Sequence, residues 1–225
     1  MGQWLNLAAA DGFRLQAYRA DPPAGGGKPR GGLVVVQEIF GVNSHIRNVC
    51  DGYAQEGFVA IAPALFDRVQ RGVALGYGPE DVARGRDLKA HAKTNHALSD
   101  VAAARSSVAP AGNVGVIGYC WGGFVTWMAA ARLNGFACGV CYYGGGMTEA
   151  VDEKPLCAVM AHFGELDAAI PVDGVRRFAK AHPEVDVLLY DAEHGFNCDE
   201  RKSYNAAAAA LARQRTLDFL RNHVG

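Results

Sequence analysis

One run of ten residues, VGVIGYCWGG at positions 114–123, constrains the fold of this chain more than any other. Its first residues are apolar and β-branched, as in a parallel strand that is covered on both faces, and residues 124–132 have helical composition. Gly118 and Gly122 bracket Cys120, a spacing typical of a strained strand-to-helix turn that exposes its central side chain. We therefore expect Cys120 at the tip of a tight turn, at the carboxyl edge of a parallel sheet.

The start of the helix after Cys120 has chemical consequences. Its free N–H groups and the positive end of its dipole stabilise negative charge, so they favour the thiolate of Cys120 over the thiol. The same N–H groups can hold an oxyanion. The alternative is that Cys120 is a small buried apolar residue and that the glycines only permit close packing.

Apolar runs alternate with helical patterns along the rest of the chain, and short loops separate them. This alternation predicts an α/β fold with a mostly parallel, doubly wound sheet and helices on both faces. The turn dipeptide Asp11-Gly12 predicts an opening hairpin of residues 5–8 and 13–18, and residues 64–79 are expected to form a long loop at the carboxyl edge. Further strands are expected at residues 33–36, 58–62, 136–143, 156–163 and 185–190, and helices at about 44–56, at 80–108 in two pieces, at 172–181 and at 205–222.

Length and composition limit the classes of protein that fit. With 225 residues, half of them hydrophobic, and no shift in composition, the chain is expected to form a single domain over residues 1–225. The formal net charge of -1, from 22 basic and 23 acidic residues, provides no footprint for nucleic acid or an anionic membrane. Without a signal-peptide pattern or a long apolar stretch, a cytoplasmic protein with six reduced cysteines is expected. The expected partner is a small molecule, and the expected assembly is a monomer or a small homo-oligomer.

A thiol nucleophile needs a base that takes its proton and an acid that orients this base. On a fold of this kind both come from loops after later strands, in the chain order nucleophile, acid, base. Asp167 follows the expected strand at 156–163, and His194 follows the one at 185–190. Glu165 and Asp173 are alternatives for the acid, and the alternative for His194 is an ordinary histidine of a surface loop.

Four features together carry a resemblance to a known family, namely QEIFG at 37–41, GYCWGG at 118–123, Asp167, and HGF at 194–196. With them the chain resembles the dienelactone hydrolase (carboxymethylenebutenolidase) family of the α/β-hydrolase superfamily, from about residue 33 to residue 220. The resemblance implies an α/β-hydrolase fold and a triad of Cys120, His194 and Asp167. It also implies that the chain hydrolyses a small lactone or activated ester through an acyl-enzyme, without a metal or an organic cofactor.

The resemblance gives three further residues a role. It implies that the carboxylate of Glu38 pairs with the resting thiol and helps to take the thiol's proton once substrate has entered. The N–H groups of Ile39 and Trp121 would form the oxyanion hole, as the geometry of the turn also suggests. Without the resemblance, Glu38 would be interpreted as a solvated loop carboxylate or as a cap of the following helix.

Two positions depart from the family pattern. Where characterised dienelactone hydrolases have a serine and, three residues beyond it, an arginine that grips the substrate carboxylate, this chain has Gly195 and Cys198. A second family arginine corresponds to Arg84, which we expect to bind substrate, and Arg86 and Arg201 are the alternatives. Because a guanidinium is the natural partner of a carboxylate, the missing arginine weakens the case for dienelactone itself as the substrate.

Two features of residues 136–143 complete the list of candidates. Cys138 and Cys141 form a CxxC pair, but the strand period places their thiols on opposite faces, so core packing is expected rather than a redox or zinc site. Tyr143, at the end of the same run, is expected to line the substrate pocket, with core packing as the alternative.

Two other functions are compatible with the same residues. A broader carboxylesterase or thioesterase would hydrolyse simple aryl esters and show no preference for a lactone that carries a carboxylate. A non-hydrolytic thiol sensor or ligand-binding protein on the same scaffold would use the reactive thiol of Cys120 without turnover.

Overall fold

The structure is a computed structural model that describes residues 2–25 and 27–225. Within these residues, eight strands form one sheet in the order β1-β2-β4-β3-β5-β6-β7-β8. β2 is antiparallel to both of its neighbours, and the other pairs are parallel. The strands are β1 (Gln3–Ala8), β2 (Arg14–Ala20), β3 (Gly31–Val36), β4 (Phe58–Pro63), β5 (Val114–Tyr119), β6 (Cys138–Tyr142), β7 (Ala158–Gly164) and β8 (Val185–Tyr190). The α-helices are α1 (Ser44–Gln55), α2 (Pro79–His91), α3 (Thr94–Val108), α4 (Trp121–Arg132), α5 (Val172–Ala181) and α6 (Ala206–His223), and η1 (Leu65–Arg68) and η2 (Ala109–Ala111) are short 3-10 turns.

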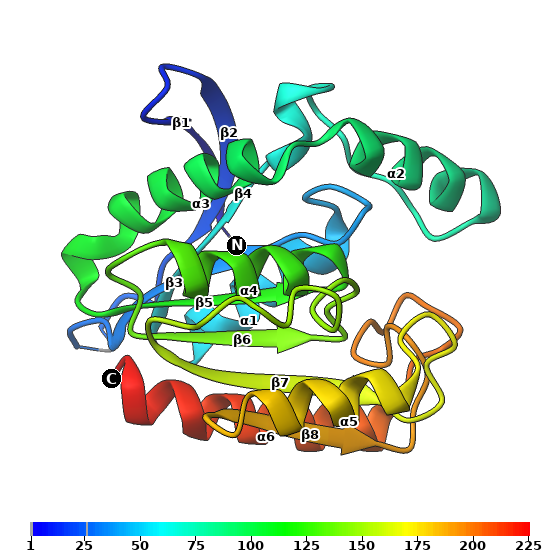
Figure 1. The fold of residues 1–225 in the computed structure, drawn as a ribbon. Coiled ribbons are helices and arrows are strands. Elements are labelled where there is room, and N and C mark those ends of the chain that lie inside the picture. Colours follow the sequence, from blue (N-terminus) through cyan, green and yellow to red (C-terminus); the bar gives the residue numbers. More distant parts are fainter. Residues whose placement is uncertain (1, 26) are drawn as a thin grey trace.

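Helices cover both faces of the sheet (Figure 1). α1 and α6 lie side by side on one face, where Arg213 of α6 donates a hydrogen bond of 3.4 Å to the carbonyl oxygen of Gly52 in α1. α3, α4 and α5 lie on the other face, and the rings of Trp127 in α4 and Phe178 in α5 are 5.1 Å apart. β3, β4 and β5 are buried at every residue between these layers, which explains why they are apolar throughout. The predicted α/β fold with a mostly parallel, doubly wound sheet is confirmed.

The boundaries of most elements agree with the prediction. The opening hairpin is β1 and β2, and α1 begins after Asn43, whose side chain accepts a hydrogen bond of 3.2 Å from the N–H of Ile46. The long helical pattern is divided into α2 and α3. β6 and β7 begin two residues later than predicted, because an apolar residue such as Leu156 lies in a loop and is 58% exposed. Among the described residues, no helix combines the length and the apolar character needed to span a bilayer.

The CxxC pair belongs to the core. Cys138 and Cys141 are buried in β6, and both are free thiols. A Cβ atom at Gly115 of β5 would lie 3.3 Å from the sulfur of Cys138, so this sulfur fills the space that the glycine leaves. The expectation of core packing is confirmed.

The turn between β5 and α4 has no room for side chains at its two glycines. A Cβ atom at Gly118 would lie 2.0 Å from the carbonyl oxygen of Gly122. A Cβ atom at Gly122 would lie 2.4 Å from the carbonyl oxygens of both Val36 and Gln37. These are backbone atoms, which cannot rotate away, so the two glycines allow α4 to start directly against the end of β3, and this contact positions Cys120.

Gly122→Ala is expected to lower the free energy of unfolding by about 3 kcal/mol, because an added methyl group in a close-packed contact costs about 1–3 kcal/mol or more. Gly52→Ala in α1 is the matched control, since the nearest atom to its Cβ position is Nη2 of Arg213 at 3.8 Å. This control should raise the free energy of unfolding by about 0.5–1 kcal/mol, because alanine is the better helix former. Urea unfolding followed by circular dichroism measures both, and a Gly122→Ala protein as stable as the parent would contradict the close contact.

Candidate active site

Cys120 lies at the tip of the turn in a backbone conformation that few residues adopt. Its φ is 55° and its ψ is -118°. Within residues 2–25 and 27–225, Cys120 and Tyr143 are the two non-glycine residues with positive φ, and such strain collects at functional sites. The N–H of Cys120 donates a hydrogen bond of 3.0 Å to the carbonyl oxygen of Tyr142, which ties the turn to β6, and the Cys120 residue is partly exposed. The structure thus places Cys120 where the sequence predicts it.

The structure brings His194 and Asp167 together from the loops that follow two neighbouring strands. Nδ1 of His194 lies 2.7 Å from Oδ2 of Asp167. The other carboxylate oxygen of Asp167 accepts hydrogen bonds from two backbone N–H groups of its own turn, at 2.8 and 3.1 Å. Asp167 is 3% exposed, whereas Glu165 and Asp173, the alternatives for the acid, are exposed. Of these carboxylates, Asp167 is the one placed to orient the imidazole.

The surroundings of His194 raise its pKa. Burial alone lowers the pKa of this ring, but the hydrogen bond with Asp167 and the neighbouring side chain of Cys120 outweigh burial and raise the pKa of His194 to about 10. Below this pKa the ring is an imidazolium that interacts with both Asp167 and Cys120.

The N–H groups of Ile39 and Trp121 are available for an oxyanion. Trp121 is the first residue of α4, where an N–H has no partner within the helix. In the part of the chain that the structure describes, neither N–H donates a hydrogen bond to a protein acceptor. The contact of Gly122 with the carbonyl oxygens of Val36 and Gln37 brings the segment before Ile39 to the start of α4. Both N–H groups therefore lie at the same edge of the sheet as Cys120.

Glu38 is completely buried, and two donors hold its carboxylate. Nη1 of Arg201 donates to Oε1 at 3.2 Å, and the hydroxyl of Tyr77 donates to Oε2 at 3.2 Å. This arrangement differs from the predicted pairing with the resting thiol, because no hydrogen bond between described residues joins Glu38 to Cys120. The physical reason is that a guanidinium and a hydroxyl donate stronger hydrogen bonds to a carboxylate than a thiol does.

The guanidinium of Arg201 lies directly over Gly195, the residue after His194. A Cβ atom at Gly195 would lie 2.4 Å from Nη1 of Arg201, so a serine at this position would displace the guanidinium. The position of the Arg201 guanidinium therefore requires a glycine at position 195. Arg84 and Arg86 are exposed on α2, and neither side chain has a hydrogen bond or ion pair with another described residue. Of the three arginines considered, Arg201 is the one that lies beside His194.

Tyr143 follows β6 and packs against the ring of His194. The two ring centroids are 5.2 Å apart. The hydroxyl of Tyr143 is buried and has no hydrogen-bond partner among the described residues, whereas that of Tyr142 pairs with Thr216 at 2.7 Å. Burial raises the pKa of Tyr143 well above its usual value, so this hydroxyl stays protonated and can donate. An unpaired donor next to His194 is consistent with the predicted contact between Tyr143 and substrate.

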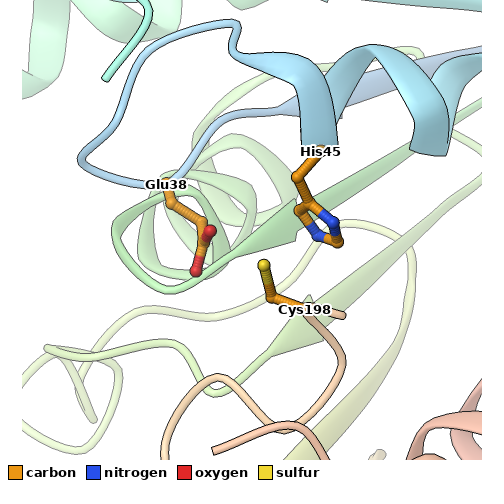
Figure 2. Close-up of side chains that lie close together, drawn as sticks. All are labelled: Glu38, His45 and Cys198. Atoms are coloured by element: carbon orange, nitrogen blue, oxygen red, sulfur yellow. The ribbon is translucent and has the colours of Figure 1, made fainter. Parts of the chain in front are cut away.

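Two residues of this region were not predicted, Tyr77 and His45. Tyr77 lies in the loop of residues 64–79, and His45 lies in the first turn of α1 and is 3% exposed. The ring of His45, the carboxylate of Glu38 and the thiol of Cys198 each offer one atom, and these atoms lie within 4.8 Å of one another. Figure 2 shows the three side chains converging from two segments, with Glu38 and His45 on the connection from β3 into α1 and Cys198 on the loop after β8. No local pattern marks such a cluster, because only the fold brings its members together.

Comparisons with known proteins identify the family and the fold of the chain. A sequence model with the description "Dienelactone hydrolase family" matches residues 15–224. A protein of Synechocystis sp. with the name "Putative carboxymethylenebutenolidase" is 37% identical over 231 residues, which cover 94% of this chain and 93% of that protein. The crystal structure of a "Putative Dienelactone Hydrolase" from Klebsiella pneumoniae matches 96% of this chain and 98% of its own, with a TM-score of 0.82 and 30% identity. A Pyrococcus furiosus esterase of 15% identity, with a TM-score of 0.69 over 100% of this chain and 92% of its own, shares the fold. The fold is that of the α/β-hydrolases, as predicted.

Proposed function

Because the chain belongs to the dienelactone hydrolase family, we propose that it hydrolyses a small lactone or activated ester with Cys120 as nucleophile, His194 as acid and base, and Asp167 orienting His194. The observation that carries the proposal is the position of His194. Its Nδ1 lies 2.7 Å from the Asp167 carboxylate, and its ring also interacts with the partly exposed Cys120 on the strained turn. This is the arrangement that activates a thiol nucleophile.

The proposed reaction runs through an acyl-enzyme. His194 takes the proton of the Cys120 thiol, the sulfur attacks the carbonyl carbon, and the N–H groups of Ile39 and Trp121 hold the oxyanion of the tetrahedral intermediate. The carbon–oxygen bond then breaks, and the leaving oxygen takes a proton from the imidazolium of His194. A water molecule gives a proton to His194 and attacks the thioester carbon. The carbon–sulfur bond then breaks and His194 returns the proton to the sulfur, which releases the carboxylic acid and restores the Cys120 thiol.

Arg201 suggests how a substrate with a carboxylate would bind. Its guanidinium lies beside His194 and uses one N–H of its Nη1 for Glu38 at 3.2 Å, so other donors of the planar group remain for a second carboxylate. A substrate carboxylate would compete with Glu38 for the guanidinium. Glu38 would then be free to help His194 take the proton of the Cys120 thiol, the role that the family resemblance implies.

The direct test is a panel of substrates, namely cis- and trans-dienelactone beside phenyl and nitrophenyl acetates, with the parent protein and Cys120→Ala. Turnover of the panel by the parent and its loss in Cys120→Ala are expected. Turnover of the aryl acetates with no preference for the lactones would favour a broader carboxylesterase. Reaction of the thiol without turnover of any ester would leave a thiol sensor as the function.

Arg201→Gln is expected to lower kcat/KM for the anionic dienelactones by about 10- to 100-fold, since a charge-assisted hydrogen bond is worth about 1.5–3 kcal/mol. The loss on neutral aryl acetates should be much smaller, because these esters carry no carboxylate for the guanidinium. Initial rates at substrate concentrations well below KM measure both ratios.

Arg84→Gln is the matched control for this experiment, because Arg84 is exposed on α2. Equal losses on anionic and neutral substrates in Arg201→Gln would assign Arg201 to holding Glu38 and not to binding substrate. A selective loss on anionic lactones in Arg84→Gln would restore Arg84 as the substrate-binding arginine.

A further inference from the structure

We propose that Glu38, His45 and Cys198 bind one divalent transition-metal ion of the Zn²⁺ or Co²⁺ type, and that the bound ion inhibits the hydrolase. The ion is not a cofactor of the reaction, because no step proposed above passes through these three ligands together. The inhibition rests on the role proposed for Glu38. The binding of the ion does not.

The donor set fits such an ion. A carboxylate oxygen, an imidazole nitrogen and a thiol sulfur lie within 4.8 Å of one another, and all three residues are buried (Figure 2). Zn²⁺ binds these three donor types at about 2.0–2.3 Å, and its sites often combine three protein ligands with one open position. Two ligands of one tetrahedral ion lie about 3.5 Å apart, so the side chains need to close by about 1 Å. A soft thiolate beside an imidazole disfavours Mg²⁺ and Ca²⁺.

The histidine supplies an independent sign of a missing ligand. Nε2 of His45 is buried and has no hydrogen-bond partner among the described residues, which is uncommon for a buried ring nitrogen. Nδ1 of the same ring lies 3.3 Å from Oδ1 of Asp199. Histidines that bind metals typically donate their other N–H to a carboxylate, and Asp199 provides that carboxylate.

One member of this cluster, His45, borders a cavity. A cavity of about 390 Å³ lies between α1, α6 and the loop after β8, and His45 and Asp199 are among the residues that line it. The side chain of Asp199 is 66% exposed, whereas that of His45 is 4% exposed. His45 therefore belongs both to the lining of the cavity and to the cluster, and a cation attracted by Asp199 would meet this ring.

The positive charge of Arg201 opposes the binding of a cation at Glu38. Nη1 of Arg201 lies 3.2 Å from Oε1 of Glu38, and the hydroxyl of Tyr77 lies 3.2 Å from Oε2. A divalent ion on Glu38 has to share the carboxylate with the guanidinium or displace it. Removing the positive charge at position 201 should therefore tighten metal binding, whereas removing any ligand should weaken it.

The bound ion would act on the reaction through Glu38. A metal ligand cannot at the same time move toward Cys120 and take its proton. The thiol of Cys198 loses its proton to solvent when it binds the ion, since the thiolate is the form that binds metals.

Binding can be measured with Co²⁺ in the Cys120→Ala protein, in which the nucleophile cannot contribute a thiolate. We expect a single Co²⁺ per chain by equilibrium dialysis, with a thiolate-to-cobalt charge-transfer band in the near ultraviolet. Adding Cys198→Ser or His45→Gln should abolish the band and weaken binding at least about 100-fold, since even outer-shell partners are worth about 10- to 100-fold.

Three further variants sharpen the test. Asp199→Asn, at an exposed side chain, should weaken binding about 10-fold, and Arg201→Gln should tighten it. Cys157→Ser, which removes another partly exposed cysteine, should leave both the band and the affinity unchanged. Circular dichroism and thermal unfolding establish that each variant is folded. Absence of Co²⁺ binding in the Cys120→Ala protein, or a band that survives Cys198→Ser, would overturn the site.

Inhibition is measured separately, with the parent thiol in place. Zn²⁺ should slow aryl acetate hydrolysis by the parent and by Cys157→Ser, and it should not slow residual hydrolysis by Cys198→Ser. Equal inhibition of Cys198→Ser would show that Zn²⁺ acts at Cys120, and would overturn the inhibitory role while the Co²⁺ result stands. If the parent does not hydrolyse esters at all, the proposed function fails, and the dialysis result still decides the site.

Discussion

Cys120→Ala is expected to lower kcat/KM for aryl acetates by at least about 10⁴-fold, because removing one member of a nucleophile–base pair costs about as much as removing the whole pair. The structure supplies the reason. Cys120 is partly exposed on a turn with a φ of 55°, and its side chain acts directly on the ring of His194. No other thiol has this setting, since Cys50, Cys138, Cys141 and Cys198 are buried and Cys157 lies away from the turn.

The matched control for this variant is Cys157→Ala, which removes a second partly exposed cysteine. Its kcat/KM should equal that of the parent. Initial rates of nitrophenol release measure both variants, and titration with a thiol reagent counts the reactive group. Activity in Cys120→Ala within tenfold of the parent would remove this thiol from the mechanism. An equal loss in Cys157→Ala would point to general damage from losing a cysteine.

The sequence could predict those parts of the site that depend on neighbouring residues or on the order of strands along the chain. The two glycines around Cys120 are a local signal, because the contact of Gly118 with Gly122 lies within one turn. Asp167 and His194 are far apart along the chain, but each follows a strand, and parallel strands end at the same edge. Chain order therefore placed both residues at this edge, with Glu165 and Asp173 left as alternatives to Asp167.

The pairing of Glu38 had no such signal. Its partner Arg201 lies 163 residues away, and Tyr77 lies 39 residues away in a loop without periodicity. Composition and spacing cannot rank distant arginines, so Arg84 was preferred on the family pattern alone. Arg201 can lie beside His194 because Gly195 has no side chain, since a Cβ atom there would lie 2.4 Å from the Arg201 guanidinium. This contact can be seen only in the folded structure.

Two buried histidines, His162 and His45, show that residue type and chain position do not reveal which polar side chains have hydrogen-bond partners. His162 lies within β7, and its nitrogens pair with Tyr190 at 2.8 Å and Thr216 at 3.0 Å. Burial lowers the pKa of His162 to about 3, so it is a neutral, satisfied core residue. His45 lies at the start of α1, long before Cys120 in the chain, and one of its nitrogens has no partner among the described residues. The sequence does not distinguish these two histidines, whereas their hydrogen bonds in the structure do.

Asp167→Asn is expected to lower kcat/KM by about 10²- to 10⁴-fold and to move the alkaline limb of its pH profile to lower pH. Burial lowers the pKa of His194, whereas Asp167 and Cys120 together raise it to about 10. The amide removes the negative charge at position 167, so the imidazolium that protonates the leaving oxygen is lost at a lower pH. Asp173→Asn is the matched control, since Asp173 is exposed at the start of α5.

The pH dependence of thermal stability provides a second test of the interaction between Asp167 and His194. The pKa of His194 rises from 6.5 to about 10 on folding, so the protonated ring stabilises the folded protein fully below pH 6.5, and this stabilisation is lost as the pH rises toward 10. The parent should therefore lose thermal stability across this window more steeply than Asp167→Asn, with Asp173→Asn following the parent. Thermal unfolding at a series of pH values measures the slopes. If Asp167→Asn kept both the parent's slope and its alkaline limb, the carboxylate would not be what holds the imidazolium, and His194 would owe its charge to Cys120 alone.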